Sequence, residues 1–144
     1  MKNFFAFLLL LGVLGSCKSD DLSQDSNELE GVYRTNAFLD PLCIAITDEN
    51  QLPRLDIVKK NNGTFDLTRT NFIPQPATQK LSGFTTKEVK DGLELYYENT
   101  KVGTYVVGKW YDDKKDKEVS SKVLMVSYSN QSKSEFFFYA GVKK

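Results

Sequence analysis

Four carboxylates lie close together in the second half of the chain and form its densest group of potential metal ligands. They are Asp112, Asp113, Asp116 and Glu118. Several oxygen ligands within one loop are what Ca²⁺ requires. Lysines are interspersed among these carboxylates, however, and the spacing lacks the central glycine of an EF-hand loop. We therefore predict a solvated turn here, with no metal site and no cofactor.

Nucleophilic catalysis is disfavoured by the residue types that the sequence lacks. The chain contains no histidine, which excludes Ser-His-Asp and Cys-His arrangements and His-containing zinc sites. Cys43 lies in the apolar run from Leu42 to Ile46 and is predicted to be a small buried hydrophobic residue. A catalytic pair of carboxylates can come together in the fold from distant positions, without a recognisable spacing in the sequence. A carboxylate-based hydrolase therefore stays a distant alternative. We expect no catalytic residue and no enzyme activity.

The charge balance argues against a nucleic-acid partner. The chain has 19 Lys and Arg residues against 19 Asp and Glu residues. Phosphate backbones demand clustered cations, and the sequence contains no basic block. We therefore predict no binding to nucleic acid.

The first residues combine a positive charge, a short apolar run and a cysteine. Lys2 precedes an apolar run from Phe4 to Leu14. A membrane-spanning helix needs roughly 20 apolar residues, so this shorter run is typical of a signal peptide. Leu14-Gly15-Ser16-Cys17 resembles the lipobox of bacterial lipoproteins. The resemblance implies cleavage before Cys17, a diacylglycerol on its sulfur, and an acyl chain such as palmitate on its amine.

The residues after Cys17 bear on the destination of the protein. In bacterial lipoproteins an Asp directly after the cysteine is associated with inner-membrane retention, and Lys18 occupies that position here. Ser19-Asp20-Asp21 resembles the acidic export signal of Bacteroidetes surface lipoproteins. Two or three acyl chains hold a protein durably at a bilayer. We expect an outer-membrane protein at the cell surface, with the membrane as a partner through Cys17.

The length leaves room for one folded domain after the anchor. Residues 1–16 form the predicted signal peptide and residues 17–27 a lipidated flexible tether. Residues 28–144 form the predicted single β-barrel-like domain.

Strand signals dominate this domain, and no segment shows the 3.6-residue apolar period of a substantial helix. Asn61-Asn62-Gly63 predicts a tight primed turn between two strands, and Asp91-Gly92 predicts a second turn. The eight predicted strands cover residues 31–38, 55–59, 64–69, 86–90, 93–98, 101–111, 119–128 and 135–142.

Short connections between these strands favour an all-β antiparallel meander that closes into a small barrel, with a β-sandwich as the alternative. The last predicted strand is apolar on both faces, because Phe136 and Phe138 alternate with Phe137 and Tyr139. Such a strand needs cover on both sides, from a loop or from a partner. The opening Leu29-Glu30-Gly31-Val32-Tyr33 resembles the start of lipocalin-like barrels.

Five residues are candidates for ligand binding. Phe72 and Ile73 lie beside two prolines in residues 71–78, a segment suited to cover a barrel mouth or dock a partner. Tyr105, Trp110 and Phe138 are expected near the barrel interior. A domain of this size needs most of its aromatic side chains to fill its core. We therefore predict a non-catalytic interaction module in an envelope assembly, with a lipocalin-like carrier of a small apolar ligand as the alternative.

Overall fold

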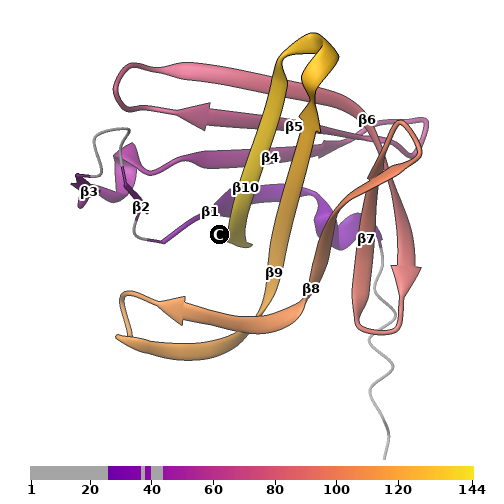
Figure 1. Cartoon of the computed structure of the whole chain (residues 1–144). Helices are drawn as coiled ribbons and strands as arrows, with labels where there is room; N and C mark the ends of the chain where they lie inside the picture. Colours follow the sequence, from indigo (N-terminus) through magenta and orange to yellow (C-terminus); the bar gives the residue numbers. More distant parts are fainter. Residues whose placement is uncertain (1–25, 37, 40–43) are drawn as a thin grey trace, which may run out of the picture.

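Eight antiparallel strands close into a barrel in the computed structural model, which describes residues 26–36, 38–39 and 44–144. From β4 to β10 each strand pairs with the next one in the chain, and β1 closes the wall between β10 and β4 (Figure 1). The predicted meander barrel is confirmed. Its strands are β1 (Gly31–Arg34), β4 (Arg54–Lys59), β5 (Phe65–Asn71), β6 (Ala77–Val89), β7 (Gly92–Tyr97), β8 (Thr100–Asp112), β9 (Lys117–Asn130) and β10 (Glu135–Lys143).

Short elements complete the described chain. η1 (Ser26–Leu29) precedes β1, η2 (Glu49–Gln51) precedes β4, and η3 (Gln131–Lys133) joins β9 to β10. β2 (Phe38–Leu39) and β3 (Ala45–Ile46) pair with each other and lie to one side of the barrel (Figure 1). Nowhere in the described chain is there a helix long and apolar enough to cross a bilayer. The predicted signal peptide, Cys17 and Cys43 lie outside the described residues.

Both predicted hairpins form, but their turns differ from the expected ones. Between β4 and β5 the positive φ falls on Gly63, at 79°, and the Gly63 amide donates to the Lys60 carbonyl over 2.9 Å. The turn between β6 and β7 precedes Gly92, which pairs with Val89. Two consecutive positive φ values, as a type I′ turn needs, occur instead at Glu98 and Asn99, at 48° and 63°. Neither central residue of this turn is a glycine, the usual sequence signal for positive φ, so the sequence did not indicate this turn.

β6 is longer than predicted and belongs to two parts of the wall. The predicted strand began at residue 86, whereas β6 begins at Ala77. Its first part pairs with β5 as far as Phe84, and its last part pairs with β7 from Thr85. Gly83, with a φ of 91°, lies where the two parts meet. Polar residues in the first part interrupt the apolar alternation, which is why the sequence did not reveal it.

Inward-pointing side chains fill the barrel. The largest fully buried ones include Tyr33, Phe65, Phe84 and Phe137. The Tyr33 hydroxyl donates to the Leu29 carbonyl over 2.7 Å, which attaches η1 to the core. The Tyr139 hydroxyl donates to the Tyr33 carbonyl over 2.9 Å. Burial raises the pKa of both Tyr33 and Tyr139, so both hydroxyls remain protonated donors.

β8 and β9 continue beyond the barrel as a two-stranded arm, residues 107–122. Pairing of β8 with β7 ends at Val106, and pairing of β9 with β10 ends at Val123. The arm strands therefore pair only with each other. Along the arm Val107 and Tyr111 are exposed, whereas Trp110 and its cross-strand partner Val119 are half-buried.

The tip of the arm is attached to the segments around β1 and η2. The Asn36 side-chain amide donates to the Tyr111 carbonyl over 2.9 Å. Lys114 pairs with Glu49 over 3.2 Å. These contacts hold the arm beside the end of β1, at the place where the candidate site lies.

Candidate functional site

Tyr105, a predicted ligand residue, belongs to the packed core. Its side chain is only 4 % exposed. Its ring meets the ring of Tyr33 edge-on, with centroids 5.9 Å apart. Tyr105 is therefore in the interior, as predicted, but it is covered by protein side chains.

Trp110 and Phe138 do not lie near the interior, so that part of the prediction is wrong. Trp110 is on the arm, and its indole Nε1 is buried without a hydrogen-bond partner among the described residues. Phe138 alternates with the buried Phe137 and Tyr139, so it points outward and is 40 % exposed. Ile73 is half-buried in the loop between β5 and β6.

The barrel closes along a seam between β1 and β10. β1 pairs with β10 only at Val142 and Lys143, so the earlier residues of β10 have one edge that β1 does not cover. Side chains from the opposite wall bind this edge. Arg69 Nη1 donates to the Phe138 carbonyl over 2.8 Å, and Gln79 Nε2 donates to the Phe136 carbonyl over 2.7 Å.

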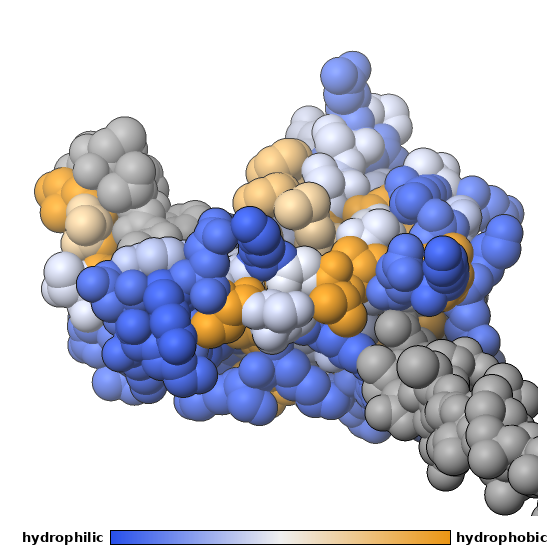
Figure 2. All heavy atoms as spheres, turned by 90° about the horizontal axis from the view of Figure 1, so that it is seen from below, coloured by the Kyte–Doolittle hydropathy of each residue, from blue (hydrophilic) through white to orange (hydrophobic). Residues whose placement is uncertain are grey.

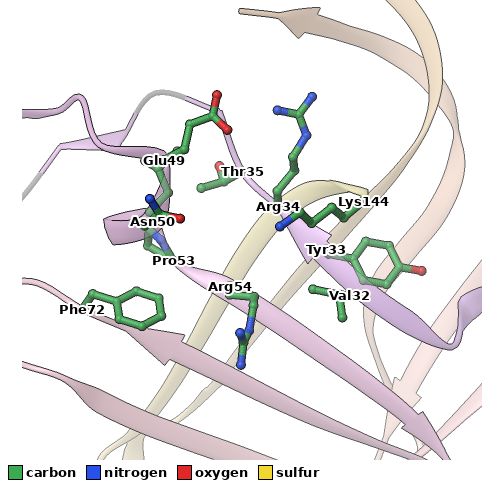
Figure 3. Close-up of a pocket in the computed structure, with 11 residues that line it drawn as sticks. Val32, Tyr33, Arg34, Thr35, Glu49, Asn50, Pro53, Arg54, Phe72 and Lys144 are labelled. Atoms are coloured by element: carbon green, nitrogen blue, oxygen red, sulfur yellow. The ribbon is translucent and has the colours of Figure 1, made fainter. Parts of the chain in front are cut away.

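A hollow of about 150 Å³ lies on the outside of the barrel at this seam. Figure 3 shows its walls, which come from β1, the η2 segment, the start of β4 and Phe72. Val32, Pro53 and Phe72 supply apolar surface, while Thr35 and Asn50 supply a hydroxyl and an amide. Phe72 is thus the predicted loop residue that reaches a hollow.

Three cationic side chains line the same hollow. Arg34 and Arg54 are direct cross-strand partners in the β1–β4 ladder, and like charges in that position repel. Arg34 pairs with Asp113 over a long 3.6 Å, and Arg54 pairs with Asp56 over 3.0 Å. Among the described residues no carboxylate pairs with Lys144. Its amine is directed between the two arginines (Figure 3).

A second hollow, of about 40 Å³, shares Thr35 and Pro53 with the first. Arg69 and Phe138 line it. Arg69 is half-buried and, in the described part of the chain, forms no ion pair; its Nε donates to the Asn71 side-chain oxygen over 3.0 Å. Burial lowers the pKa of Arg69, yet a guanidinium remains charged at neutral pH. We call the two adjoining hollows the seam groove.

The structure therefore brings two of the five predicted ligand residues, Phe72 and Phe138, to the borders of one groove. The cations of this groove were not predicted; they are Arg34, Arg54, Arg69 and Lys144. These residues lie far apart in the chain and meet through strand register and barrel closure. No local sequence pattern carries that information.

The outer face of β9 and β10 is a second candidate surface. Phe136 is 61 % exposed, Met125 is 51 % exposed, and Phe138 lies on the same side of β10. We call these three residues the outer apolar face. Figure 2 shows the molecule from below relative to Figure 1. On that face the hydrophobic residues form small groups between hydrophilic ones.

The clustered carboxylates of the arm tip are occupied by neighbouring groups. Asp112 is buried, accepts the amides of Lys114 and Lys115, and pairs with the Lys115 amine over 3.1 Å, so it is not the exposed turn residue that was predicted. Asp116 accepts the Tyr111 hydroxyl, and Glu118 pairs with Lys109 over 3.4 Å. Within the described residues no group of three or more carboxylate or cysteine side chains is placed to hold a metal ion.

The function of these surfaces has to be argued from their own chemistry. The seam groove places cations beside apolar side chains, and the outer apolar face presents exposed rings to solvent. No protein-family model, curated protein or solved structure matches the chain.

Proposed function

We propose that this protein is a lipid-anchored lipoprotein of the outer membrane that acts as a non-catalytic interaction module at the cell surface. The resemblance of Leu14-Gly15-Ser16-Cys17 to a lipobox supports the anchor. Lys18 and the acidic run Ser19-Asp20-Asp21 support export to the surface. In this proposal the barrel is a rigid carrier of a binding surface.

The observation that carries the proposal is the contrast between the two faces of β10. Its inward residues Phe137 and Tyr139 are buried in the core, whereas Phe136 and Phe138 are uncovered. Removing one large apolar side chain from water is worth roughly 1.5–3 kcal/mol. A partner protein with an apolar surface that covers Phe136, Phe138 and Met125 gains this energy, and such a face is typical of an interaction site.

The environment of the carboxylates supports binding rather than catalysis. Asp66 is fixed between Lys60 and Lys80, each 3.0 Å away. Glu94 pairs with Lys101 over 2.5 Å and accepts the Tyr96 hydroxyl. A general acid at neutral pH needs a raised carboxyl pKa, but the partners of Asp66 and Glu94 lower theirs.

Photo-crosslinking in the producing cells tests the proposal. A photoreactive phenylalanine analogue replaces Phe136 in the full chain, and a matched chain carries it at Val107, an exposed apolar residue of the arm. We expect a covalent adduct with one envelope protein from position 136 and none from position 107. The measurement is the mass of the adduct and the identity of its peptides.

A second pair of chains separates specific contact from chance proximity. With the probe at Ser129, the cross-strand partner of Phe136, the change Phe136→Ser should abolish the adduct and Val107→Ser should not. Equal adducts from positions 136 and 107, or no adduct from either, would refute the docking surface. Capture of a lipid-sized molecule instead of a protein would favour the carrier alternative.

A further inference from the structure

We infer that the wall split, the place where β8 and β9 diverge, binds an extended segment of a partner protein that adds as a short strand along β9. The wall split lies between residues 100–102 of β8 and residues 127–130 of β9. This inference deepens the proposed function and rests on it, because it states how a partner of the outer apolar face would also bind the barrel backbone.

The ladder between β8 and β9 ends before either strand does. Toward the start of β8, the last pair of this ladder is Gly103 with Val126. In the described chain, Thr100 and Lys101 of β8 pair only with β7, and β9 beyond Val126 pairs only with β10. Figure 1 shows the two strands diverging above their labels. Each strand therefore has an edge that no described strand covers there.

A hollow of about 290 Å³ lies between these two edges. Its lining residues come from the β7–β8 turn, the first residues of β8 and the last residues of β9. Among them Val102 and Tyr128 are buried. The ring of Tyr97 meets the ring of Tyr128 edge-on, with centroids 4.9 Å apart. The side of the hollow that faces the core is therefore apolar and aromatic.

The backbone of β9 directs hydrogen-bonding groups into this hollow. The Phe136 and Phe138 carbonyls of β10 accept side-chain donors from the opposite wall, so they point away from β9. In an antiparallel ladder, directly opposite residues either bond to each other or both point away from each other. The opposite residues Ser129 and Ser127 therefore direct their backbone groups toward β8. At Ser129 the ladder with β8 has ended, so its N–H and C=O face the hollow.

A glycine of β8 supports the same direction independently. A Cβ at Gly103 would collide with the Met125 carbonyl oxygen, so this oxygen faces β8. Backbone groups alternate in direction along a strand, so those of Ser127 and Ser129 face the same way as Met125. The occupant has to offer an N–H and a C=O in the plane of the sheet. An extended peptide that adds to a sheet edge offers these groups, and main-chain hydrogen bonds of this kind give such a complex its affinity.

The neighbouring side chains predict the composition of the added segment. Ser127 and Ser129 are exposed and lie opposite Phe138 and Phe136 of the outer apolar face. Successive side chains of a strand point to opposite faces. One set would extend the outer apolar face, and the other would meet the aromatic side of the hollow. We therefore expect apolar residues on both faces of a segment of roughly four residues, the length of the uncovered β9 edge.

A synthetic peptide from the partner tests the strand. It is the peptide that carries the adduct with the photoreactive residue at position 136, and it is made with one backbone amide N-methylated at a time. Isothermal titration calorimetry measures its binding to the full chain in detergent. Only every second N–H of an added antiparallel strand bonds to β9. We expect N-methylation to weaken binding about tenfold or more at alternate residues and to leave it unchanged at the intervening ones.

Two substitutions at Ser129 locate the strand on β9. Ser129→Pro removes the N–H that faces the hollow, at an edge where proline is tolerated. Ser129→Ala removes only the hydroxyl and is the matched control. We expect the proline variant to weaken the unmodified peptide about tenfold or more and the alanine variant to retain it. Thermal unfolding followed by circular dichroism checks that both variants are folded.

The outcomes separate this inference from the proposed function. No adduct from position 136 would refute the docking surface and the inference with it. An adduct whose peptide loses the same affinity at every N-methylated residue, or at none, would overturn the strand and leave the docking surface standing. Full binding to a folded Ser129→Pro chain would do the same. The N-methylated series uses the unchanged barrel, so it decides the question even where Ser129→Pro does not fold.

Discussion

At the scale of single residues, the most enclosed charge of the described chain is neutralised by two specific partners. Asp66 is the most enclosed case, with 6 % of its surface exposed and two lysine amines 3.0 Å away. Hydrogen bonds from Lys80 and Lys60 lower the pKa of Asp66 to about 2. Arg69 contrasts with this arrangement, because it is half-buried and has no carboxylate partner in the described chain.

The Asp66 site predicts a stability that depends on pH. A carboxyl whose pKa is lowered by folding stabilises the native state above its ordinary pKa, and this stabilisation is lost as the pH falls. For Asp66 the loss should occur between about pH 3.8 and pH 2. Asp66→Asn should lower the midpoint of thermal unfolding at neutral pH and flatten the decline in this acid range.

Asp91→Asn, at the exposed β6–β7 turn, is the matched control for the Asp66 variant. Thermal unfolding followed by circular dichroism at a series of pH values provides the measurement. An Asp66→Asn chain with the same acid profile as the Asp91→Asn chain would show that the two lysines contribute no net stability.

At the scale of elements, β10 is the strand that connects the core to both candidate surfaces. One face contributes Phe137 and Tyr139 to the interior, and the other presents Phe136 and Phe138. Its uncovered edge is bound by Arg69 and Gln79 from across the barrel. Edge carbonyls that receive such donors are no longer available for pairing with another strand. We therefore expect a binding partner to contact the side chains of β10 more than its backbone.

Adjacent phenylalanines of β10 provide a direct test of this assignment of faces. Phe137→Ala should lower the free energy of unfolding by about 3–5 kcal/mol, because it leaves a cavity in the core. Phe138→Ala should cost less than about 1 kcal/mol, since its ring is already partly in water. Urea unfolding of both chains measures the difference, and equal costs would contradict the register of β10.

The strands and the barrel could be predicted because alternation and turn residues are local signals. The β4–β5 hairpin and β7 follow the alternation of apolar residues closely. The first half of β6 could not be predicted, since its outer face is polar and Gly83 bends the strand. Both strands of the arm were predicted, but not their extension beyond the barrel, because their buried and exposed faces exchange beyond Val106.

The candidate site was less predictable than the strands. Phe72 attracted attention through its apolar character beside prolines, and it does line the seam groove. The pairing of Arg34 with Arg54 depends on the register between β1 and β4, which are separated by a long excursion of the chain. Which residues of two distant strands become partners cannot be deduced from the spacing of residues along the sequence.

At the scale of the whole molecule, the first described residues and Phe136 of the outer apolar face lie at opposite ends of β10. The Lys143 amine donates to the Glu28 carbonyl of η1 over 2.9 Å, and Glu28 also pairs with Lys122. Phe136 lies at the other end of the same strand. At about 3.3 Å per residue, roughly 23 Å separates the two ends. If Cys17 is lipidated as proposed, this arrangement allows Phe136 to lie on the side of β10 away from the membrane.

The proposed lipid anchor predicts a clear difference between the two cysteines. Cys17→Ala should release the full chain from the membrane fraction, because the thioether lipid and the cleavage signal are lost together. Cys43→Ala is the matched control and should remain in that fraction. Fractionation followed by immunoblotting measures both, and retention of the Cys17→Ala chain would refute lipidation as the anchor.

The closure of the barrel through β1 has a consequence for its motions. β1 is four residues long and meets β10 at two residue pairs, whereas β8 and β9 pair along most of their length. The β1–β10 joint is therefore where the cylinder opens most easily into a ribbon, and the amides of β1 should exchange with solvent before those of β8 and β9.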